Sequence, residues 1–212
     1  MRALRERAGR TFAVAALSIL ALAARGACAA DGAVATDTPE ATVASLHRGL
    51  IAVSRANSGA NVGDRYRALE RLIESTHDLP YIAAFALRKQ WPSLSENDRQ
   101  RFVAAFEKLS VMTYASRFKN VSADTFKSGG PGTVESGRAH VLTAITRKGQ
   151  PDIPLDYMLE QQDGAWRIIN IIADGVSDLA LKRAEYQRIL SRGSIDDLIK
   201  ELEAQTARLL QP

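Results

Sequence analysis

Residues 166–177 read Trp-Arg-Ile-Ile-Asn-Ile-Ile-Ala-Asp-Gly-Val-Ser, and the rest of the predicted fold is arranged around this stretch. Four isoleucines fall within five positions without alternation of apolar and polar residues. This pattern indicates a strand that is covered on both faces and lies inside the fold, away from a sheet edge. Asp163-Gly164, just before it, is a hairpin signal. After it, Gly175 permits a turn from strand to helix, and Ser177 can cap that helix.

Strand signals also precede this stretch, and together they predict a meander of about four antiparallel strands. Residues 133–146 contain an apolar run, and Phe126 sits in a first, shorter candidate strand. The chain then turns at residues 148–151, where a glycine and a proline occur. Between residues 155 and 160 apolar residues alternate with charged ones, which is typical of a half-buried strand. The apolar members, which share the face directed inward, are Leu155, Tyr157 and Leu159.

The first half of the sequence predicts four amphipathic helices. Each begins at a capping residue, and in two of them a proline follows within the first turn. The predicted starts are Thr38-Pro39, Asp64, Asp78-Leu79-Pro80 and Ser95, the last with Asp98 as a capping box.

Two further helices close the chain. One is predicted from Leu179 to Leu190, before Gly193, and the other follows a capping box of Ser194 and Asp197. A helical first half, a strand meander and two closing helices predict an α+β fold, in which helices pack against one face of an antiparallel sheet.

The first 29 residues have the pattern of a secretory signal peptide. Arginines precede an apolar run from Phe12 to Ala24, and Ala27-Cys28-Ala29 is a small-residue cleavage site. The run is too short to span a bilayer. Arg25 stands where a lipoprotein signal needs an apolar residue. We therefore expect an exported protein whose mature part, residues 30–212, is a single domain.

Removal of the signal peptide changes the charge and the cysteine content. The chain has 28 basic and 24 acidic residues, but the first 29 residues hold five arginines and one glutamate, so 23 of each remain. A nucleic-acid-binding protein needs a surplus of Lys and Arg, so this class is excluded. The one cysteine, Cys28, lies at the cleavage site, so we expect no disulfide in the mature domain.

Residues able to carry catalysis are few and scattered. His47, His77 and His140 lie far apart in the sequence without metal-ligand spacing, and neither a phosphate loop nor a nucleophile elbow is present. Asp174 and Asp178 suit the start of a helix, where carboxylates complement the helix dipole. The sequence therefore predicts a protein that is not an enzyme and that uses neither a metal nor a cofactor.

Several short motifs, taken in order, resemble the MlaC family of periplasmic lipid-binding proteins. They are Leu79-Pro80-Tyr81 with Ala86-Leu87 and Trp91, Arg101 to Phe106, and Trp166 to Ser177 followed by Tyr186 and Gly193. The resemblance extends from about residue 39 to residue 210. Residues 112–118 and 177–186 are more similar to the hopanoid-associated HpnM branch. Asn170 departs from the family pattern, in which an aspartate is commoner at this position.

The resemblance implies an NTF2-like curved sheet whose helices enclose a lipid pocket. It also implies a shuttle that carries a membrane lipid, either a hopanoid or a glycerophospholipid, between the inner and outer membranes and so maintains the outer membrane. The implied partners are an inner-membrane transporter of the MlaD or HpnN type and an outer-membrane protein of the MlaA type.

Apolar residues at helical and strand spacing are the candidate lining of this pocket. Sheltering lipid chains from water is favourable by about 0.8 kcal/mol per methylene, so a plain apolar cavity suffices for a shuttle. The same residues would form the core of any α+β domain, so the sequence leaves both interpretations open. The candidates are Tyr81, Phe85, Phe102, Phe106, Leu109, Leu155, Tyr157, Leu159, Ile169 and Ile171.

Two other function classes remain open at this point. One is a lipid-free interaction protein that steadies an envelope complex. The other is a small periplasmic enzyme on an NTF2-like scaffold, which would need an acid–base pair pointing into the pocket. Asp156 with His140 is the candidate pair for that class.

Overall fold

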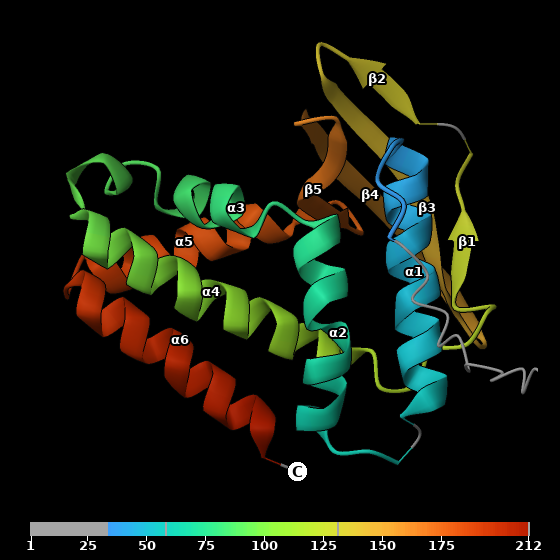
Figure 1. Ribbon diagram of the computed structural model, residues 1–212, viewed down its shortest axis with the longest axis horizontal. Coiled ribbons are helices and arrows are strands. Elements are labelled where there is room, and N and C mark those ends of the chain that lie inside the picture. Colours follow the sequence, from blue (N-terminus) through green and yellow to red (C-terminus); the bar gives the residue numbers. More distant parts are fainter. Residues whose placement is uncertain (1–33, 58, 131, 212) are drawn as a thin grey trace, which may run out of the picture. The chain divides into compact units, whose positions relative to one another are not determined.

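The computed structural model describes residues 34–57, 59–130 and 132–211, so the predicted signal peptide lies outside the described residues. Six α-helices and six strands occupy these ranges, with a short 3-10 helix at Trp91–Ser93 (Figure 1). Among the described helices, none has the length and apolar character needed to cross a bilayer. The helices are α1 (Pro39–Ala56), α2 (Val62–Thr76), α3 (Leu79–Leu87), α4 (Glu96–Arg117), α5 (Asp178–Leu190) and α6 (Ile195–Leu210). The strands are β1 (Phe126–Ser128), β2 (Thr133–Glu135), β3 (Arg138–Arg147), β4 (Gln150–Gln162), β5 (Ala165–Ala173) and β6 (Val176–Ser177).

The sheet is an antiparallel meander, which confirms the α+β prediction. Its order is β1-β3-β4-β5-β6, and β2 pairs with the same edge of β3 that β1 uses further along. The prediction of one strand over residues 133–146 is wrong, because the chain reverses between β2 and β3. Ser136 and Gly137 have φ values of 52° and 77°, which is the geometry of a tight two-residue hairpin turn.

Two further hairpin turns of the same kind flank β5. Asp163 and Gly164 have φ values of 50° and 80°, as the sequence predicts. Asp174 and Gly175, at 51° and 77°, also form a hairpin turn, which returns the chain as β6. Gly175 therefore does not lead straight from strand to helix. Ser177 caps α5 as predicted, because its hydroxyl oxygen accepts a hydrogen bond from the Ala180 N–H at 3.1 Å.

A β-bulge in β5 explains the isoleucine run that the sequence analysis interpreted as a fully covered strand. Leu159 of β4 pairs with Ile168, whereas Met158 pairs with Asn170, so Ile169 is an extra residue. The extra residue shifts the alternation by one position. Ile168 before the bulge and Ile171 after it consequently share the inner face of the sheet, opposite Leu159 and Tyr157 respectively.

The position of β5 in the sheet also differs from the expectation. On the side away from β4, β6 is its one partner among the described strands, through Ile172 and Ala173, and Ile168 forms an isolated bridge with His77. Further along this edge, the Asp78 N–H donates to the Ile168 carbonyl at 3.0 Å, and the Trp166 N–H donates to the Thr36 carbonyl at 2.7 Å. The strand is thus next to the edge of the sheet, and chain segments outside the sheet cover its backbone.

The helix starts agree with the predicted caps except in α2. Thr38, Asp78 and Ser194 accept the expected backbone hydrogen bonds, and Ser194 forms a complete capping box. Asn61, rather than Asp64, caps α2, and its side chain accepts from the Asp64 N–H. Asn ranks as high as Asp in this role, and Asp64 remains favourable inside the first turn.

At the start of α4 the capping box is only half formed. Ser95 Oγ accepts from the Asp98 N–H at 3.1 Å. Its hydroxyl donates to the Asp98 carboxylate at 2.7 Å, so this carboxylate binds the side chain of Ser95 and not its backbone.

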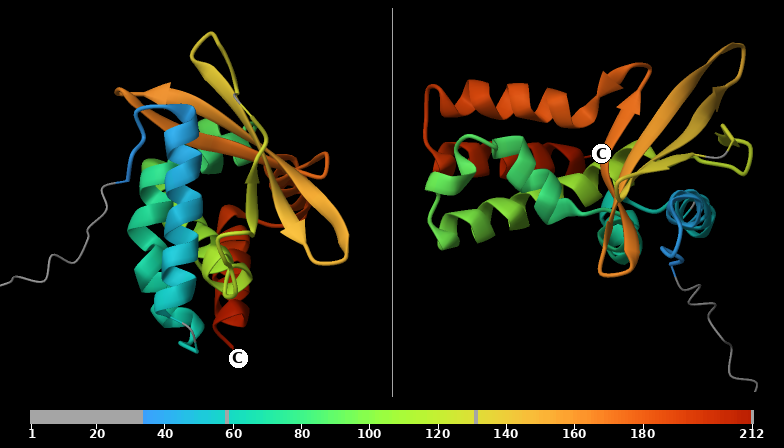
Figure 2. Two further views of the ribbon diagram at one scale, coloured as in Figure 1. Left: turned by 90° about the vertical axis from the view of Figure 1, so that its right-hand side faces the viewer. Right: turned by 90° about the horizontal axis from the view of Figure 1, so that it is seen from above.

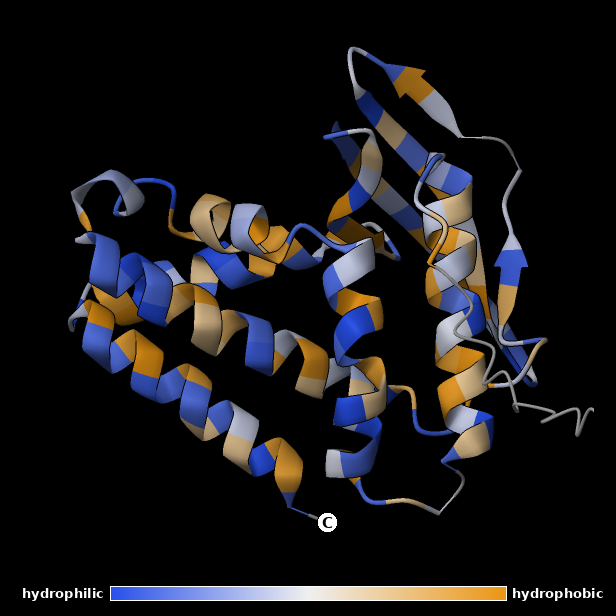
Figure 3. Ribbon diagram, viewed as in Figure 1, coloured by the Kyte–Doolittle hydropathy of each residue, from blue (hydrophilic) through white to orange (hydrophobic). Residues whose placement is uncertain are grey.

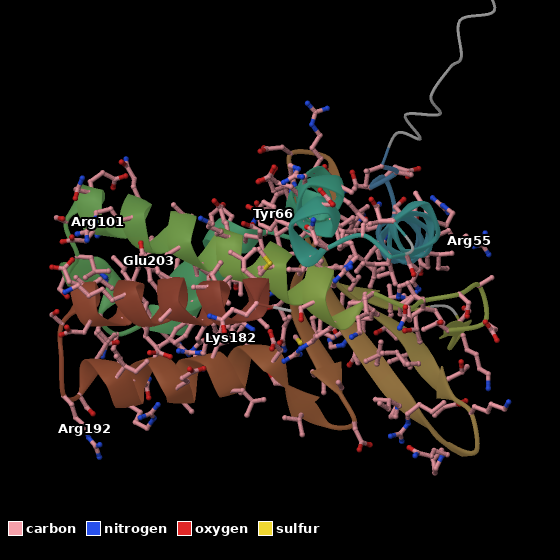
Figure 4. All side chains as sticks on the ribbon, turned by 90° about the horizontal axis from the view of Figure 1, so that it is seen from below. Arg55, Tyr66, Arg101, Lys182, Arg192 and Glu203 are labelled. Carbon is pink, nitrogen blue, oxygen red and sulfur yellow. The ribbon has the colours of Figure 1, made fainter. Side chains whose placement is uncertain are left out.

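The helices form two groups around the sheet. α1 and α2 stand against the sheet, whereas α3, α4, α5 and α6 pack on one another in a bundle that extends away from it (Figures 1 and 2). Arg101 of α4 and Asp196 of α6, joined at 2.7 Å, tie two helix starts together at the far end of the bundle (Figure 4). Most of the buried apolar residues, from both helices and strands, form one core. Figure 3 shows how apolar and polar residues alternate along these helices and strands.

Deletion of Ile169 tests the role of the bulge. Because the residues on both sides already lie in register with β4, the deletion should close the bulge and leave every other inward side chain in place. We expect a cooperatively folded protein that is less stable by about 2–5 kcal/mol, the usual effect of losing one large apolar side chain from a core. Urea denaturation followed by circular dichroism measures this loss.

Deletion of Ile171 is the matched control. It would carry Asp174 into the position of Ala173, which is on the inner face, and break the turn to β6. This variant should fail to fold cooperatively. Equal stability of the two deletions would contradict the bulge as the reason for the isoleucine run.

Candidate functional site

The inner face of the sheet is an apolar surface that the helices cover. Val141 and Thr143 of β3 and the alternating residues of β4 point toward the helices and are buried. The predicted inward direction of Leu155, Tyr157 and Leu159 is therefore confirmed. Val43, Leu46 and Leu50 of α1 cover part of this face, and all of them belong to the continuous core.

A line of aromatic and histidine side chains runs through this interior from the sheet toward α2; we call it the aromatic seam. His47 of α1 bonds through Nε2 to the Tyr157 hydroxyl at 3.0 Å and stacks on Phe126 with ring centroids 3.8 Å apart. Phe118 continues the line at 6.1 Å from Phe126, and Tyr114 stacks on Phe118 at 5.5 Å.

The seam ends at His77, which follows α2. Its Nε2 lies 2.9 Å from the Tyr114 hydroxyl, and its Nδ1 lies 3.0 Å from Thr76 Oγ1 and 3.2 Å from the Ile73 carbonyl. Both ring nitrogens thus have protein partners. In the part of the chain that the structure describes, no group of three or more His, Cys, Asp or Glu side chains could hold a metal ion.

The aromatic seam places polar side-chain atoms in the interior, and these side chains are uncharged. Burial lowers the pKa of both His47 and His77 to about 4, so both imidazoles are neutral at pH 7. Burial likewise raises the pKa of the Tyr114 and Tyr157 hydroxyls well above the usual value. An apolar ligand in this interior would meet neutral hydrogen-bonding groups and aromatic rings.

The ten residues predicted to line a pocket fall into two groups. Leu155, Tyr157, Leu159 and Ile171 lie together on the inner face of the sheet, and Ile169 is the buried bulge residue beside them. The other five lie in the helical bundle. Phe102, Phe106 and Leu109 are buried on α4, and Tyr81 and Phe85 are half-buried on α3.

Apart from Ile169, the residues of both groups belong to or pack against one core, but the two groups do not face a single space. Phe102 stands 5.9 Å from the Tyr186 ring of α5 and 6.2 Å from Phe106, so these rings pack on one another inside the bundle. Two surface pockets of the described part of the chain, of about 290 and 330 Å³, have mixed polar and apolar linings, and the smaller one touches His77 at the end of the aromatic seam. Neither pocket reaches the inner face of the sheet.

His140 and Asp156, the candidate pair for an enzyme, do lie together. His140 Nδ1 is 2.9 Å from each oxygen of the Asp156 carboxylate. Both side chains, however, project from the outer face of the sheet, next to the exposed Leu142, and not toward the apolar interior. The structure therefore does not direct this acid–base pair into a pocket, which that function class would require.

The architecture defines a class of α+β proteins in which an antiparallel sheet and a set of helices enclose an apolar interior. Its fold is similar to that of a phospholipid-binding protein from Ralstonia solanacearum solved in complex with a phospholipid, with a TM-score of 0.71 and 20% identity over 81% of this chain and 98% of that one. The sequence profile of the MlaC protein family matches residues 47–204. The chain belongs to the MlaC family.

The sequence does not reveal that these aromatic and histidine residues form one continuous seam, although it contains a signal for one of them. Val43, His47 and Leu50 recur at helical spacing, which places a histidine on the apolar face of α1. The pairing of His77 with Tyr114 leaves no such trace, because it joins residues 37 positions apart.

The buried histidines make the stability depend on pH. Because the folded-state pKa of His47 lies below the ordinary value of 6.5, the unfolded chain binds more protons between pH 6.5 and 4. Stability should therefore fall as the pH falls through this window, by roughly 2–3 kcal/mol for one histidine. Urea denaturation at several pH values measures the slope.

His47→Gln should reduce this slope by about half, because glutamine does not titrate and can still bond Tyr157, whereas His77 still titrates. Tyr157→Phe keeps the histidine and should keep the slope, although its overall stability is lower. An unchanged slope in His47→Gln would contradict the neutral, buried state of His47.

Proposed function

We propose that this protein binds a membrane phospholipid, with the acyl chains held in the apolar interior between the inner face of the sheet and the helices that cover it. The observation that carries the proposal is the fold that the chain shares with a protein solved in complex with a phospholipid, together with its place in the MlaC family. The chemistry of the interior supports it, because the apolar surface there is interrupted by neutral polar groups and not by charged ones.

Lipid entry requires the interior to open. Drug-sized ligand pockets have volumes of roughly 300–1,000 Å³, and two acyl chains need the upper part of this range. The inner-face residues instead contact the helices directly, with Leu159 fully buried. We propose that α1 separates from the sheet, since loops flank this helix. The separation would break the hydrogen bonds Thr42–Trp166 and His47–Tyr157, through which side chains of α1 are attached to the sheet.

Such an opening is energetically balanced when a lipid is present. Apolar contacts that α1 and the sheet lose on separation are formed again with the acyl chains, at about 0.8 kcal/mol for each methylene buried. The protein then needs neither a preformed cavity nor an external energy source to accept a lipid from a membrane. A closed lipid-free state and an open lipid-bound state suit a carrier that must release its ligand.

A hopanoid is a second candidate ligand. The aromatic seam favours it, because Tyr114, Phe118 and Phe126 offer flat ring surfaces to a rigid polycyclic molecule. The similarity of residues 112–118 to the hopanoid-associated branch supports the same candidate.

The proposed place of action is the periplasm. Export would follow from the signal peptide at residues 1–29, and residues 30–212 would be the single lipid-binding domain. The protein would act as a shuttle between an inner-membrane transporter of the MlaD or HpnN type and an outer-membrane protein of the MlaA type. Family membership supports these partners and a binding role without catalysis.

Filling the interior with a larger side chain tests the proposal. Leu159→Trp places an indole where acyl chains are proposed to lie, so the purified variant should lose its co-purifying lipid. Overpacking should lower its lipid-free stability by about 1–3 kcal/mol. Organic extraction followed by mass spectrometry measures the lipid, and urea denaturation measures the stability.

Leu142→Trp is the matched control, since Leu142 lies on the adjacent strand but on the exposed outer face of the sheet. It should keep the full amount of lipid. Wild-type protein that carries no lipid after mild purification from a lipid-rich host would contradict the proposal and favour a lipid-free interaction protein.

The mature N-terminus tests the proposed export. Cleavage after Ala29 or Ala30 should give an unmodified protein, because Arg25 disrupts a lipoprotein signal. Intact mass spectrometry of the protein from the periplasmic fraction measures this. A diacylated Cys28 at the N-terminus would instead show a membrane-anchored lipoprotein.

A further inference from the structure

One hydroxyl on the inner face of the sheet has no hydrogen-bond partner. Thr143 lies on β3, where it alternates with the buried Val141 and points toward the helices, and it is only 8% exposed. Its Oγ1 is buried and makes no hydrogen bond within the ranges that the structure describes. An unpartnered buried hydroxyl is destabilising, so its presence on an apolar face calls for an explanation.

The other threonines that are buried in the described part of the chain do have partners. Thr42, Thr76 and Thr206 lie in helices, and each donates to a backbone carbonyl, at 3.0, 2.8 and 2.9 Å respectively. A helical threonine can bond the carbonyl one turn before it, whereas a threonine in a strand needs a partner from elsewhere. Thr143 is therefore the exception among these side chains.

The neighbours of Thr143 on the inner face come from three elements. On the sheet, Leu155 of β4 lies opposite it, and Phe126 of β1 and Tyr157 of β4 are its diagonal neighbours. From α1, His47 reaches both diagonal neighbours, because its ring stacks on Phe126 and its Nε2 bonds the Tyr157 hydroxyl. Thr143 thus lies on the sheet surface that α1 covers, where acyl chains are proposed to bind.

The polar groups around Thr143 do not use its hydroxyl proton. Burial raises the pKa of Tyr157, and the nearby Thr143 hydroxyl partly offsets this rise, but the two side chains do not reach hydrogen-bond geometry. The Tyr157 hydroxyl bonds His47 instead, and that imidazole is neutral. The surroundings of Thr143 are consequently uncharged and leave it one donor to offer to a ligand.

Thr143 also lies at an intermediate depth of the interior. Ile145 and Ile153, next to the β3–β4 turn, are half-buried, whereas Ala139 and Leu159 at the other end of the same strands are almost fully buried. A phospholipid has the same order of parts, because ester groups join its polar head to its apolar chains. Chains that extend toward Leu159 would place these esters near Thr143.

We infer that Thr143 donates a hydrogen bond to an ester carbonyl of the bound phospholipid. A carbonyl is an uncharged acceptor without a proton, so it matches a donor in uncharged surroundings, whereas a phosphate would need a cation beside it. When α1 separates from the sheet, Tyr157 loses His47 and stays beside Thr143, so that both hydroxyls face the ligand. This inference rests on the proposed lipid-binding function and names the part of the ligand that is recognised.

The test compares two phosphatidylglycerols that differ only in how their chains are joined to glycerol. One has ester links and the other ether links, with the same chain lengths and the same fluorescent label, and each is titrated into delipidated mature protein. Wild-type protein should bind the ester lipid about two- to tenfold more tightly, as expected for one neutral hydrogen bond. Thr143→Val should lose this preference and keep its affinity for the ether lipid. Thr143→Ser retains the hydroxyl and should keep the preference.

Stability without lipid separates recognition of a ligand from a structural role. Because Thr143→Val removes an unpartnered hydroxyl, its urea midpoint should equal or exceed that of the wild type. A lower midpoint would show that the hydroxyl is already satisfied inside the lipid-free protein and would overturn the inference. Thr206→Val is the matched control, since it removes a partnered hydroxyl in α6. This control should be less stable and keep the ester preference, and loss of the preference in it would also overturn the inference.

The binding data distinguish the remaining outcomes. Equal weakening of both lipids by Thr143→Val would show a packing role for the side chain and overturn the inference. Equal wild-type affinity for the two lipids overturns the ester site alone and leaves the proposed lipid binding in place. A wild-type protein that binds neither lipid overturns the proposed function as well.

Discussion

The register of β5 on β4 is the constraint on which the rest of the structure depends. If Ile169 took a regular place in the ladder and did not bulge, the alternation would turn Ile171 and Ala173 to the outer face and Asn170 to the inner one. The bulge keeps one face of the sheet apolar along the whole strand. It also leaves Asn170 on the other face, where its side-chain oxygen accepts from the Ser177 hydroxyl and the Leu179 N–H and so positions the start of α5.

The interior that results is closely packed and uncharged, and this combination suits exchange of its contents. The apolar contacts of a dense core can be broken with little net change in free energy when acyl chains replace side chains as the packing partners. Buried ions would oppose such an exchange, because every opening would alter their solvation. The seam of His47, Tyr157, Tyr114 and His77 satisfies its polar atoms internally and adds directional contacts without that penalty.

The sequence predicts the helices, most capping residues and the antiparallel meander, because these depend on local spacing and turn chemistry. It does not reveal the bulge, since an unbroken isoleucine run is equally compatible with a strand buried on both faces. Ser136-Gly137 is a turn signal in itself, but strand signals on both sides of it favour one continuous strand. The inward direction of Leu155, Tyr157 and Leu159 follows from alternation. The absence of a partner for the Thr143 hydroxyl depends on how α1 packs on the sheet, which no local pattern contains.

The short outer strands have a consequence for contacts between molecules of this protein. A long exposed sheet edge is a template on which another chain can add a strand, and molecules with such edges tend to form fibres. Here β1 and β2 cover the edge of β3 with three residues each, and β6 covers β5 with two. The exposed edges are therefore short and interrupted, which leaves little backbone on which a neighbouring chain could add a strand.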